Sequence, residues 1–280
     1  MMKFGVIGTG TMGAGIVQIL AQEGHEVIMM ARRESSIARG FATMEKGLAR
    51  NVKRERMTQE EMDATIALVK GTNNLEDLKD VDFIIEAASE RLDAKKELFA
   101  KLDELLGEDV ILATNTSSLS ITEIASATNR PDKVIGMHFF NPVPMMKLVE
   151  VICGVATSAE VEAKVNALAE ELGKTPVRVE EAPGFVVNRI LIPMINEGIG
   201  IYADGVASAE DVDNAMKLGA NHPMGPLALG DLIGLDVCLS IMDVLYSEFQ
   251  DPKYRAHPLL RKMVRANLLG RKTKKGFFDY

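Results

Sequence analysis

Hydrophobic positions in the first part of the chain follow two patterns. Some are short continuous apolar runs, and others recur every three or four residues over longer stretches. The runs predict buried strands, and the periodic stretches predict helices that bury one face. The expected strands cover residues 3–7, 25–30, 81–86, 110–113, 133–136 and 147–152. The expected helices cover residues 11–23, 35–57, 58–68, 93–106 and 121–127. This alternation predicts a doubly wound α/β domain built on a parallel sheet.

Two of these helices, at 35–57 and 58–68, follow each other with no strand between them. The first has an apolar stripe formed by Ile37, Phe41, Met44, Leu48 and Val52. Its opposite face is basic and carries Lys46, Arg50, Lys53 and Arg54. Thr58 and Glu61 have the spacing of a capping box, which would start the second helix. We therefore expect a helical hairpin inserted into the connectivity of the sheet.

After residue 180 the strand-like runs give way to helix, and Pro183 and Gly184 interrupt the chain. Further helices are expected at 185–203, from Ser208 onward and at 231–249. The stretch 190–201 is so apolar that it should bury a face against the first domain or a sister subunit. We therefore divide the chain into residues 1–182 and a smaller, all-α domain at 183–280. The second domain is expected to support a homodimer or higher homo-oligomer.

Composition narrows the classes of function. The 280 residues are 47% hydrophobic and 26% charged, as in an ordinary globular protein, and the net charge of −8 gives no support for nucleic-acid binding. No run reaches the roughly 18 apolar residues of a membrane span, and the N-terminus lacks a signal-peptide pattern. The two cysteines, Cys153 and Cys238, form no CxxC pair, so we expect buried thiols, no metal site and a cytoplasmic protein.

A glycine motif follows the first expected strand and opens the first expected helix. It reads Gly8-Thr-Gly-Thr-Met-Gly13 and matches G-x-G-x-x-G. The first glycine permits a tight turn, and the second lets backbone approach a pyrophosphate at the helix N-terminus. This context predicts a Rossmann-type dinucleotide site. The expected contacts are Gly8, Gly10, Thr11, Met12 and Gly13.

The end of the second strand lacks the acidic residue that would hold the ribose diol of NAD. The expected position is Ala31, and Arg32 and Arg33 follow it. A guanidinium suits a phosphate dianion through paired, charge-assisted hydrogen bonds. The pattern therefore favours NADP(H), with Arg32 as the main contact of the 2′-phosphate. The alternative is that both arginines are solvated and that NAD(H) is accepted.

A histidine and a glutamate lie on two neighbouring β-prone stretches joined by a turn at Pro142 and Pro144. The first stretch delivers His138 at its exit, and the second returns with Glu150. Histidine suits proton transfer near neutral pH, and a carboxylate on its other ring nitrogen would fix the tautomer and stabilise the imidazolium. The pair is a candidate general acid/base; the alternative is a structural histidine beside a solvated glutamate.

Two further groups of polar residues fit either a site or a structural role. A polar cluster of Asn115, Ser117, Ser118 and Ser120 follows the strand at 110–113, whose end faces the expected ligand crevice. Such a cluster also suits the N-cap of the next helix. Asn188 is an amide within an otherwise apolar helix, where it would serve either a site or helix packing.

Taken together, these segments resemble the L-3-hydroxyacyl-CoA dehydrogenase family, and most of all the bacterial 3-hydroxybutyryl-CoA dehydrogenases of butyrate-forming fermentation. The resemblance rests on the glycine motif, ATNTSSLS at 113–120, GMHFFNP at 136–142, PGFVVNR at 183–189, NHPMGP at 221–226 and the closing segment 270–280. It spans essentially the whole chain. It implies an enzyme that transfers hydride between a nicotinamide dinucleotide and a 3-hydroxyacyl-CoA, here with acetoacetyl-CoA and 3-hydroxybutyryl-CoA as the substrate pair.

The resemblance also implies roles for single residues. His138 would be the general acid/base on the C3 oxygen, oriented by Glu150, and Ser117 and Asn188 would bind the substrate. Further dinucleotide contacts are implied for Glu90, Lys95, Asn115, Ser117, Asn141 and Lys272. The inserted hairpin would lie over the acyl-CoA, and Arg50 and Arg54, four residues apart, are the first candidates for its phosphates.

Four alternative classes of function were compared with the sequence. β-Hydroxyacid dehydrogenases use a catalytic lysine, so Asn188 and the His138/Glu150 pair argue against that class. A non-catalytic dinucleotide-binding relative, such as a lens crystallin or a redox sensor, would not require Ser117 together with that pair. A longer-chain 3-hydroxyacyl-CoA dehydrogenase stays open, whereas the chain is too short to hold a fused hydratase.

Overall fold

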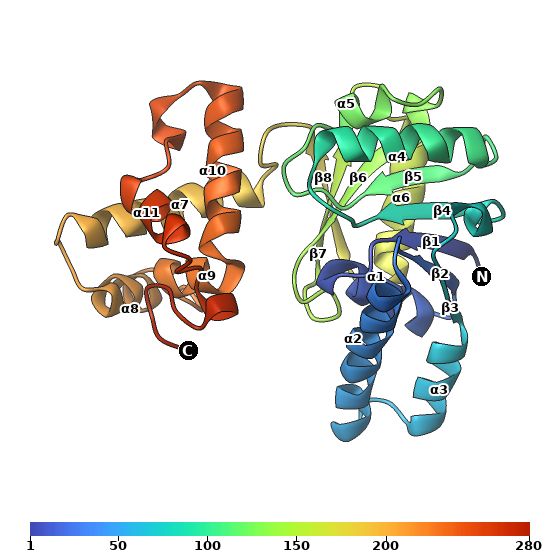
Figure 1. Ribbon diagram of the computed structural model, residues 1–280, viewed down its shortest axis with the longest axis horizontal. Helices are drawn as coiled ribbons and strands as arrows, with labels where there is room; N and C mark the ends of the chain where they lie inside the picture. Colours follow the sequence, from blue (N-terminus) through green and yellow to red (C-terminus); the bar gives the residue numbers. More distant parts are fainter. The chain divides into compact units, whose positions relative to one another are not determined.

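The computed structural model describes all residues, Met1–Tyr280, and divides into two compact units, Met1–Glu181 and Ala182–Tyr280 (Figure 1). The first unit is built on an eight-stranded sheet with the strand order β3-β2-β1-β4-β5-β6-β7-β8. Its strands are β1 Lys3–Ile7, β2 Glu26–Met30, β3 Val69–Thr72, β4 Phe83–Glu86, β5 Ile111–Thr114, β6 Val134–Phe139, β7 Leu148–Cys153 and β8 Thr175–Glu180. Neighbouring strands are parallel except β6 and β7.

The strand order reverses direction beside β1, because β2 and β3 lie on one side of it and β4, β5 and β6 on the other. In such sheets the ligand crevice forms at the carboxyl ends of the strands flanking the reversal. The ends of β1 and β4 therefore mark the expected site. This arrangement is the doubly wound, Rossmann-type domain that the alternating sequence pattern predicts.

Helices cover both faces of this sheet. They are α1 Thr11–Gln22, α2 Glu34–Lys53, α3 Gln59–Ala67, α4 Leu92–Leu105, α5 Ile121–Ala125 and α6 Ala159–Glu171, with short 3-10 turns at Leu75–Leu78 and Pro131–Lys133. α1 and α6 contribute to one apolar core with strands β1, β2, β4, β6 and β7. α4 and α5 pack against each other, and α5 contacts β6 (Figure 1). The glycine turn is thus held between a buried strand and a buried helix.

The predicted helical hairpin is present as α2 and α3 (Figure 1). Its capping box forms as expected, since the Thr58 hydroxyl accepts from the Glu61 amide at 3.1 Å and the Glu61 carboxylate accepts from the Thr58 amide at 2.7 Å. Met44 and Leu48 on the apolar stripe are buried, whereas Arg50 and Arg54 are exposed. The hairpin therefore keeps its basic face in solvent.

Two strands were absent from the sequence-based prediction. β3 and β8 are the two edges of the sheet, and each buries few of its side chains. An edge strand needs no continuous apolar run, so its sequence gives little β signal. A third difference is that β6 continues to Phe139, which places His138 inside the strand and not beyond its end.

The second unit is entirely helical. Its helices are α7 Val187–Ala203, α8 Ala209–Gly219, α9 Pro226–Ile233, α10 Leu235–Phe249 and α11 Pro258–Arg265, with 3-10 turns at Pro252–Tyr254 and Arg271–Thr273. The single helix expected at 231–249 was wrong. Gly234 adopts φ +105°, which ends α9 and starts α10. No helix of either unit is both long and apolar enough to cross a membrane.

Buried carboxylates fix this helical unit. Asp213 accepts from the backbone amides of Leu227 and Ala228 at 2.8 and 2.9 Å, so it caps the start of α9. Asp231 accepts from the amides of Phe277 and Phe278, at 3.1 and 3.0 Å, and binds the C-terminal segment. Burial nevertheless raises the pKa of Asp231.

The two cysteines generate a prediction about reactivity. Cys153 and Cys238 are both free and buried, and burial raises the pKa of both thiols, that of Cys238 to about 12. Because the thiolate is the reactive form, the folded protein should react slowly with dithiobis(nitrobenzoate) at about pH 8. After unfolding in guanidinium chloride, both thiols of each chain should react at once. Fast stoichiometric reaction of the folded protein would contradict this burial.

Candidate active site

A pocket of about 730 Å³ opens at the carboxyl ends of the strands flanking the reversal of strand order. Gly8 and Thr9 line it after β1, Ala31 and Arg32 after β2, and Lys95 from α4. Its size and place in the sheet are those of a nucleotide site in a doubly wound fold.

The glycine turn at this pocket leaves room where a phosphate needs it. A side chain on Gly8, whose φ is +112°, would collide with the carbonyl oxygen of Ala87, and one on Gly13 would collide with that of Gly8. By contrast, nothing lies within 4 Å of the position that a Cβ of Gly10 would take. The first turn of α1 has no acidic residue and no side-chain cap, so its start is suited to an anion. These residues fit a dinucleotide pyrophosphate.

The end of β2 carries the arginines that the sequence placed there. Ala31 is half-buried, whereas Arg32 and Arg33 are exposed, and all three line the pocket together with Ser36. Glu97 of α4 lines the same pocket, but its carboxylate is 2.6 Å from Lys101 Nζ. The hydrogen bond from Lys101 lowers the pKa of Glu97, and the charge of Arg32 adds to this effect.

The structure brings the predicted acid/base pair together. His138 in β6 is the register partner of Glu150 in β7, so the two side chains lie on the same face of the antiparallel pair. His138 Nδ1 lies 2.7 Å from Glu150 Oε2, and only 8% and 1% of the two side chains are exposed. The ring of Phe140 lies 4.4 Å from the imidazole, centroid to centroid. A buried carboxylate therefore meets one nitrogen of a buried imidazole.

Asn115 ties the strand of His138 to its neighbours. Its side-chain oxygen accepts from the backbone amide of Phe139 at 2.8 Å. Its own backbone amide donates to the carbonyl of Glu86 at the end of β4, at 2.7 Å. The carboxyl ends of β4, β5 and β6 are thus joined at the edge where the pocket opens.

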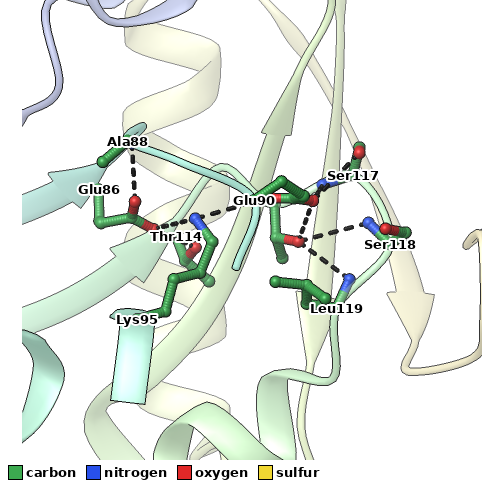
Figure 2. Close-up of polar contacts among 9 residues, drawn as sticks. Glu86, Ala88, Glu90, Lys95, Thr114, Ser117, Ser118 and Leu119 are labelled. Carbon is green, nitrogen blue, oxygen red and sulfur yellow. Dashed lines mark hydrogen bonds and ion pairs between the residues drawn. The ribbon is translucent and has the colours of Figure 1, made fainter. Parts of the chain in front are cut away.

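Ser117 lies in the turn that follows β5, and Glu90 holds this turn (Figure 2). Glu90 Oε1 accepts from the Ser117 amide at 2.6 Å, from the Ser117 hydroxyl at 3.1 Å and from the Thr116 hydroxyl at 2.5 Å. Ser117 is not the cap of the following helix, because Ser120 accepts from the Glu123 amide and starts α5. The N-cap alternative for the cluster is therefore confirmed at Ser120.

The sequence pattern did not single out Glu86, which has no exposed surface. Its carboxylate accepts from Lys95 Nζ at 2.6 Å, from the Thr114 hydroxyl at 2.7 Å and from the Ala88 amide at 2.7 Å (Figure 2). A charged residue that ends an otherwise apolar strand at the ligand edge is the signal that could have found it.

Three other predicted residues lie elsewhere in their units. Asn141 is exposed in the turn between β6 and β7, next to a cis peptide bond to Pro142. Asn188 is buried in the first turn of α7, and Lys272 forms an ion pair with Asp236 within the helical unit. Their contacts with ligands stay predictions, as do those of the exposed Arg50 and Arg54.

Similarity to known proteins covers both units. Residues 3–182 match the family model described as 3-hydroxyacyl-CoA dehydrogenase, NAD binding domain, and residues 184–280 match 3-hydroxyacyl-CoA dehydrogenase, C-terminal domain. The chain is 63% identical over 279 residues to a 3-hydroxybutyryl-CoA dehydrogenase of Clostridioides difficile, covering 100% of this chain and 99% of that protein. It is 42% identical over 282 residues to human mitochondrial hydroxyacyl-coenzyme A dehydrogenase, covering 98% and 90% of the two chains.

A solved structure gives the same result. The crystal structure of (S)-3-hydroxybutyryl-CoA dehydrogenase from Ralstonia eutropha superposes with a TM-score of 0.95 at 50% identity, covering 100% of this chain and 99% of that one. The similarity extends over both units and includes the segments that form the glycine turn and the His138/Glu150 pair. The chain belongs to the 3-hydroxyacyl-CoA dehydrogenase family, and its first unit is a dinucleotide-binding domain of that family.

Proposed function

We propose that this protein is an (S)-3-hydroxybutyryl-CoA dehydrogenase that reduces acetoacetyl-CoA reversibly at C3. The observation that carries the proposal is the buried His138/Glu150 pair, which shares one compact unit with an open glycine turn suited to a dinucleotide. A non-catalytic dinucleotide-binding protein would need the turn but not a carboxylate and an imidazole buried against each other. Relatives named for this activity support the choice of substrate.

The dinucleotide, when bound, supplies or accepts the hydride at C3. His138 donates or accepts the proton that is transferred together with the hydride. The carboxylate of Glu150 faces Nδ1, so we assign Nδ1–H to Glu150 and the exchange of a proton with the substrate oxygen to Nε2. Glu150 stabilises the imidazolium form of His138. This form is present before the alkoxide is protonated in the reducing direction and after the hydroxyl is deprotonated in the oxidising direction.

The neutral groups position the reactants. Ser117 and Asn188 hydrogen-bond the 3-oxygen and acyl group without competing for the proton. The turn at Gly8, Gly10 and Gly13, with Thr11 and Met12, accommodates the pyrophosphate. The remaining dinucleotide contacts are Glu90, Lys95, Asn115, Asn141 and Lys272. We assign the homodimer contact to the helical domain at 183–280.

NADP(H) is the favoured dinucleotide in this proposal. In the pocket at the end of β2, Ala31 takes the position of the acidic residue that would hold a ribose diol in an NAD-selective site, and Arg32 and Arg33 follow it. Glu97 forms an ion pair with Lys101 in the same pocket, and this ion pair partly neutralises the negative charge of Glu97. Arg32 supplies the main contact to the 2′-phosphate.

The first prediction concerns proton transfer. H138A should lower kcat for acetoacetyl-CoA reduction by about 100- to 10,000-fold. E150Q should lower kcat by at least about 100-fold, because the histidine loses the carboxylate that fixes its tautomer. Dinucleotide affinity, followed by titration of reduced-nicotinamide fluorescence, should change little in either variant.

H25Q serves as the matched control, because His25 is also buried but lies at the amino end of β2, where it accepts from the Met2 amide. Its kcat should stay within about threefold of the wild type even if its melting temperature falls. Near-normal turnover in H138A would refute the assignment.

The second prediction concerns the dinucleotide. Initial rates at equal, subsaturating concentration should be higher with NADPH than with NADH. R32A should raise KM for NADPH by about tenfold or more, since charge-assisted hydrogen bonds to the phosphate are lost, and should leave KM for NADH nearly unchanged. A strong preference of the wild type for NADH would overturn the selectivity while leaving the reaction intact.

The third prediction concerns coenzyme A. Neutralising the exposed pair in R50Q/R54Q should raise KM for acetoacetyl-CoA by about threefold to tenfold, because each exposed charge contributes little. Acetoacetyl-pantetheine lacks the nucleotide phosphates of coenzyme A and is the matched substrate. Equal effects on both substrates would argue against phosphate binding by the hairpin. A series of acyl lengths in the same assay tests the longer-chain alternative.

A further inference from the structure

Glu86 places a negative charge beneath the dinucleotide pocket without reaching solvent. It is the last residue of β4, is the register partner of Thr114 in β5, and has no exposed surface. Three donors meet its two oxygens, namely the ammonium of Lys95, the hydroxyl of Thr114 and the amide of Ala88. A carboxylate buried so completely is held in one geometry, because losing any donor would leave a buried charge unsatisfied.

Lys95 is shared between two carboxylates. Its Nζ lies 2.6 Å from Glu86 Oε2 and 3.5 Å from Glu90 Oε2, and only 2% of its side chain is exposed (Figure 2). The hydrogen bond of Lys95 goes to Glu86, which is the nearer carboxylate. Glu90, with 37% of its side chain exposed, is the more distant one.

The other oxygen of Glu90 organises the turn that carries Ser117. It accepts from the Ser117 amide and hydroxyl and from the Thr116 hydroxyl. The Thr116 hydroxyl accepts in turn from the amides of Ser118 and Leu119, at 3.3 and 2.9 Å. The turn therefore depends on where the Glu90 carboxylate is held.

We propose that Glu86 is a positioning residue that sets the Ser117 turn through Lys95 and Glu90. Its charge holds the ammonium of Lys95, and this leaves Glu90 Oε1 to the turn. Without that charge, Glu90 is the remaining carboxylate within 4 Å of the Lys95 ammonium. Lys95 then draws Glu90 inward, and the bonds to Ser117 and Thr116 lengthen.

The consequence for activity rests on the proposed role of Ser117 in binding the substrate. An ordered turn keeps the Ser117 hydroxyl and amide in one place before substrate arrives. Groups held in this way stabilise the transition state most. Glu86 itself touches no reactant in this scheme. Its effect should therefore appear in kcat and be transmitted by Glu90.

Amide hydrogen exchange of the full-length protein tests the positioning directly. In E86Q, the amides of Ser117, Ser118 and Leu119 should exchange about tenfold faster or more, whereas peptides from α1 and β2 should keep wild-type protection. E160Q is the matched control, because it removes an exposed Glu–Lys pair on α6, 2.8 Å long, far from the turn in sequence. Its turn should exchange as in the wild type.

E86D keeps the charge and loses one methylene, so it should give a smaller increase at the same amides. E86D replaces E86Q in the exchange experiment if E86Q is too unstable to purify. Faster exchange spread evenly over the strands, or no change at the turn despite a lower melting temperature, would reduce Glu86 to a structural residue and overturn the proposal.

A double-mutant cycle tests the route through Glu90. E86Q should lower kcat by about tenfold in the wild type but by less than about twofold in an E90Q background, since coupled residues are not additive. The same factor in both backgrounds would contradict the route. If E86Q loosens the turn but leaves kcat unchanged, the result would support the positioning role of Glu86 and count against substrate binding by Ser117. The two proposals can therefore fail separately.

Discussion

The contact between His138 and Glu150 is the interaction on which the proposed chemistry depends. A carboxylate with almost no solvent contact is costly unless donors meet it, and the imidazole Nδ1 lies within hydrogen-bond distance of it. The antiparallel register of β6 and β7 sets this contact, because it puts the two residues opposite each other. The contact between Nδ1 and Glu150, on which the proposed tautomer of the histidine rests, thus follows from the pairing of two strands.

The rest of the site uses the same physical device. β4 and β5 each place a polar group at the ligand edge, and a neighbouring strand or loop satisfies it. Asn115 joins β5 to β6, and Glu86 joins β4 to β5 and to Lys95. At the glycine turn, by contrast, the start of α1 has no side-chain cap. The pocket therefore combines one region prepared for an anion with a rigid edge that positions the reacting groups.

Much of this arrangement is readable from the sequence where chemistry and periodicity coincide. The glycine turn was predictable because the motif follows an apolar run, and the His138/Glu150 contact because two prolines turn the chain between two β-prone stretches. The edge strands β3 and β8 were not, since they bury little apolar surface. Glu86 was missed because a single glutamate after an apolar strand looks like a solvated end, and its partners Thr114 and Lys95 are distant in sequence.

The protonation of the His138 ring nitrogens is the most direct test of the proposed proton transfer. The chain has four histidines, so nitrogen-15 NMR of protein labelled at histidine gives few signals, and H138N identifies the relevant ones. We predict that in the neutral ring of His138 the proton lies on Nδ1 and Nε2 is unprotonated. An unprotonated Nδ1 facing Glu150 would contradict the account, because the carboxylate could then neither fix the tautomer nor direct Nε2 to the substrate.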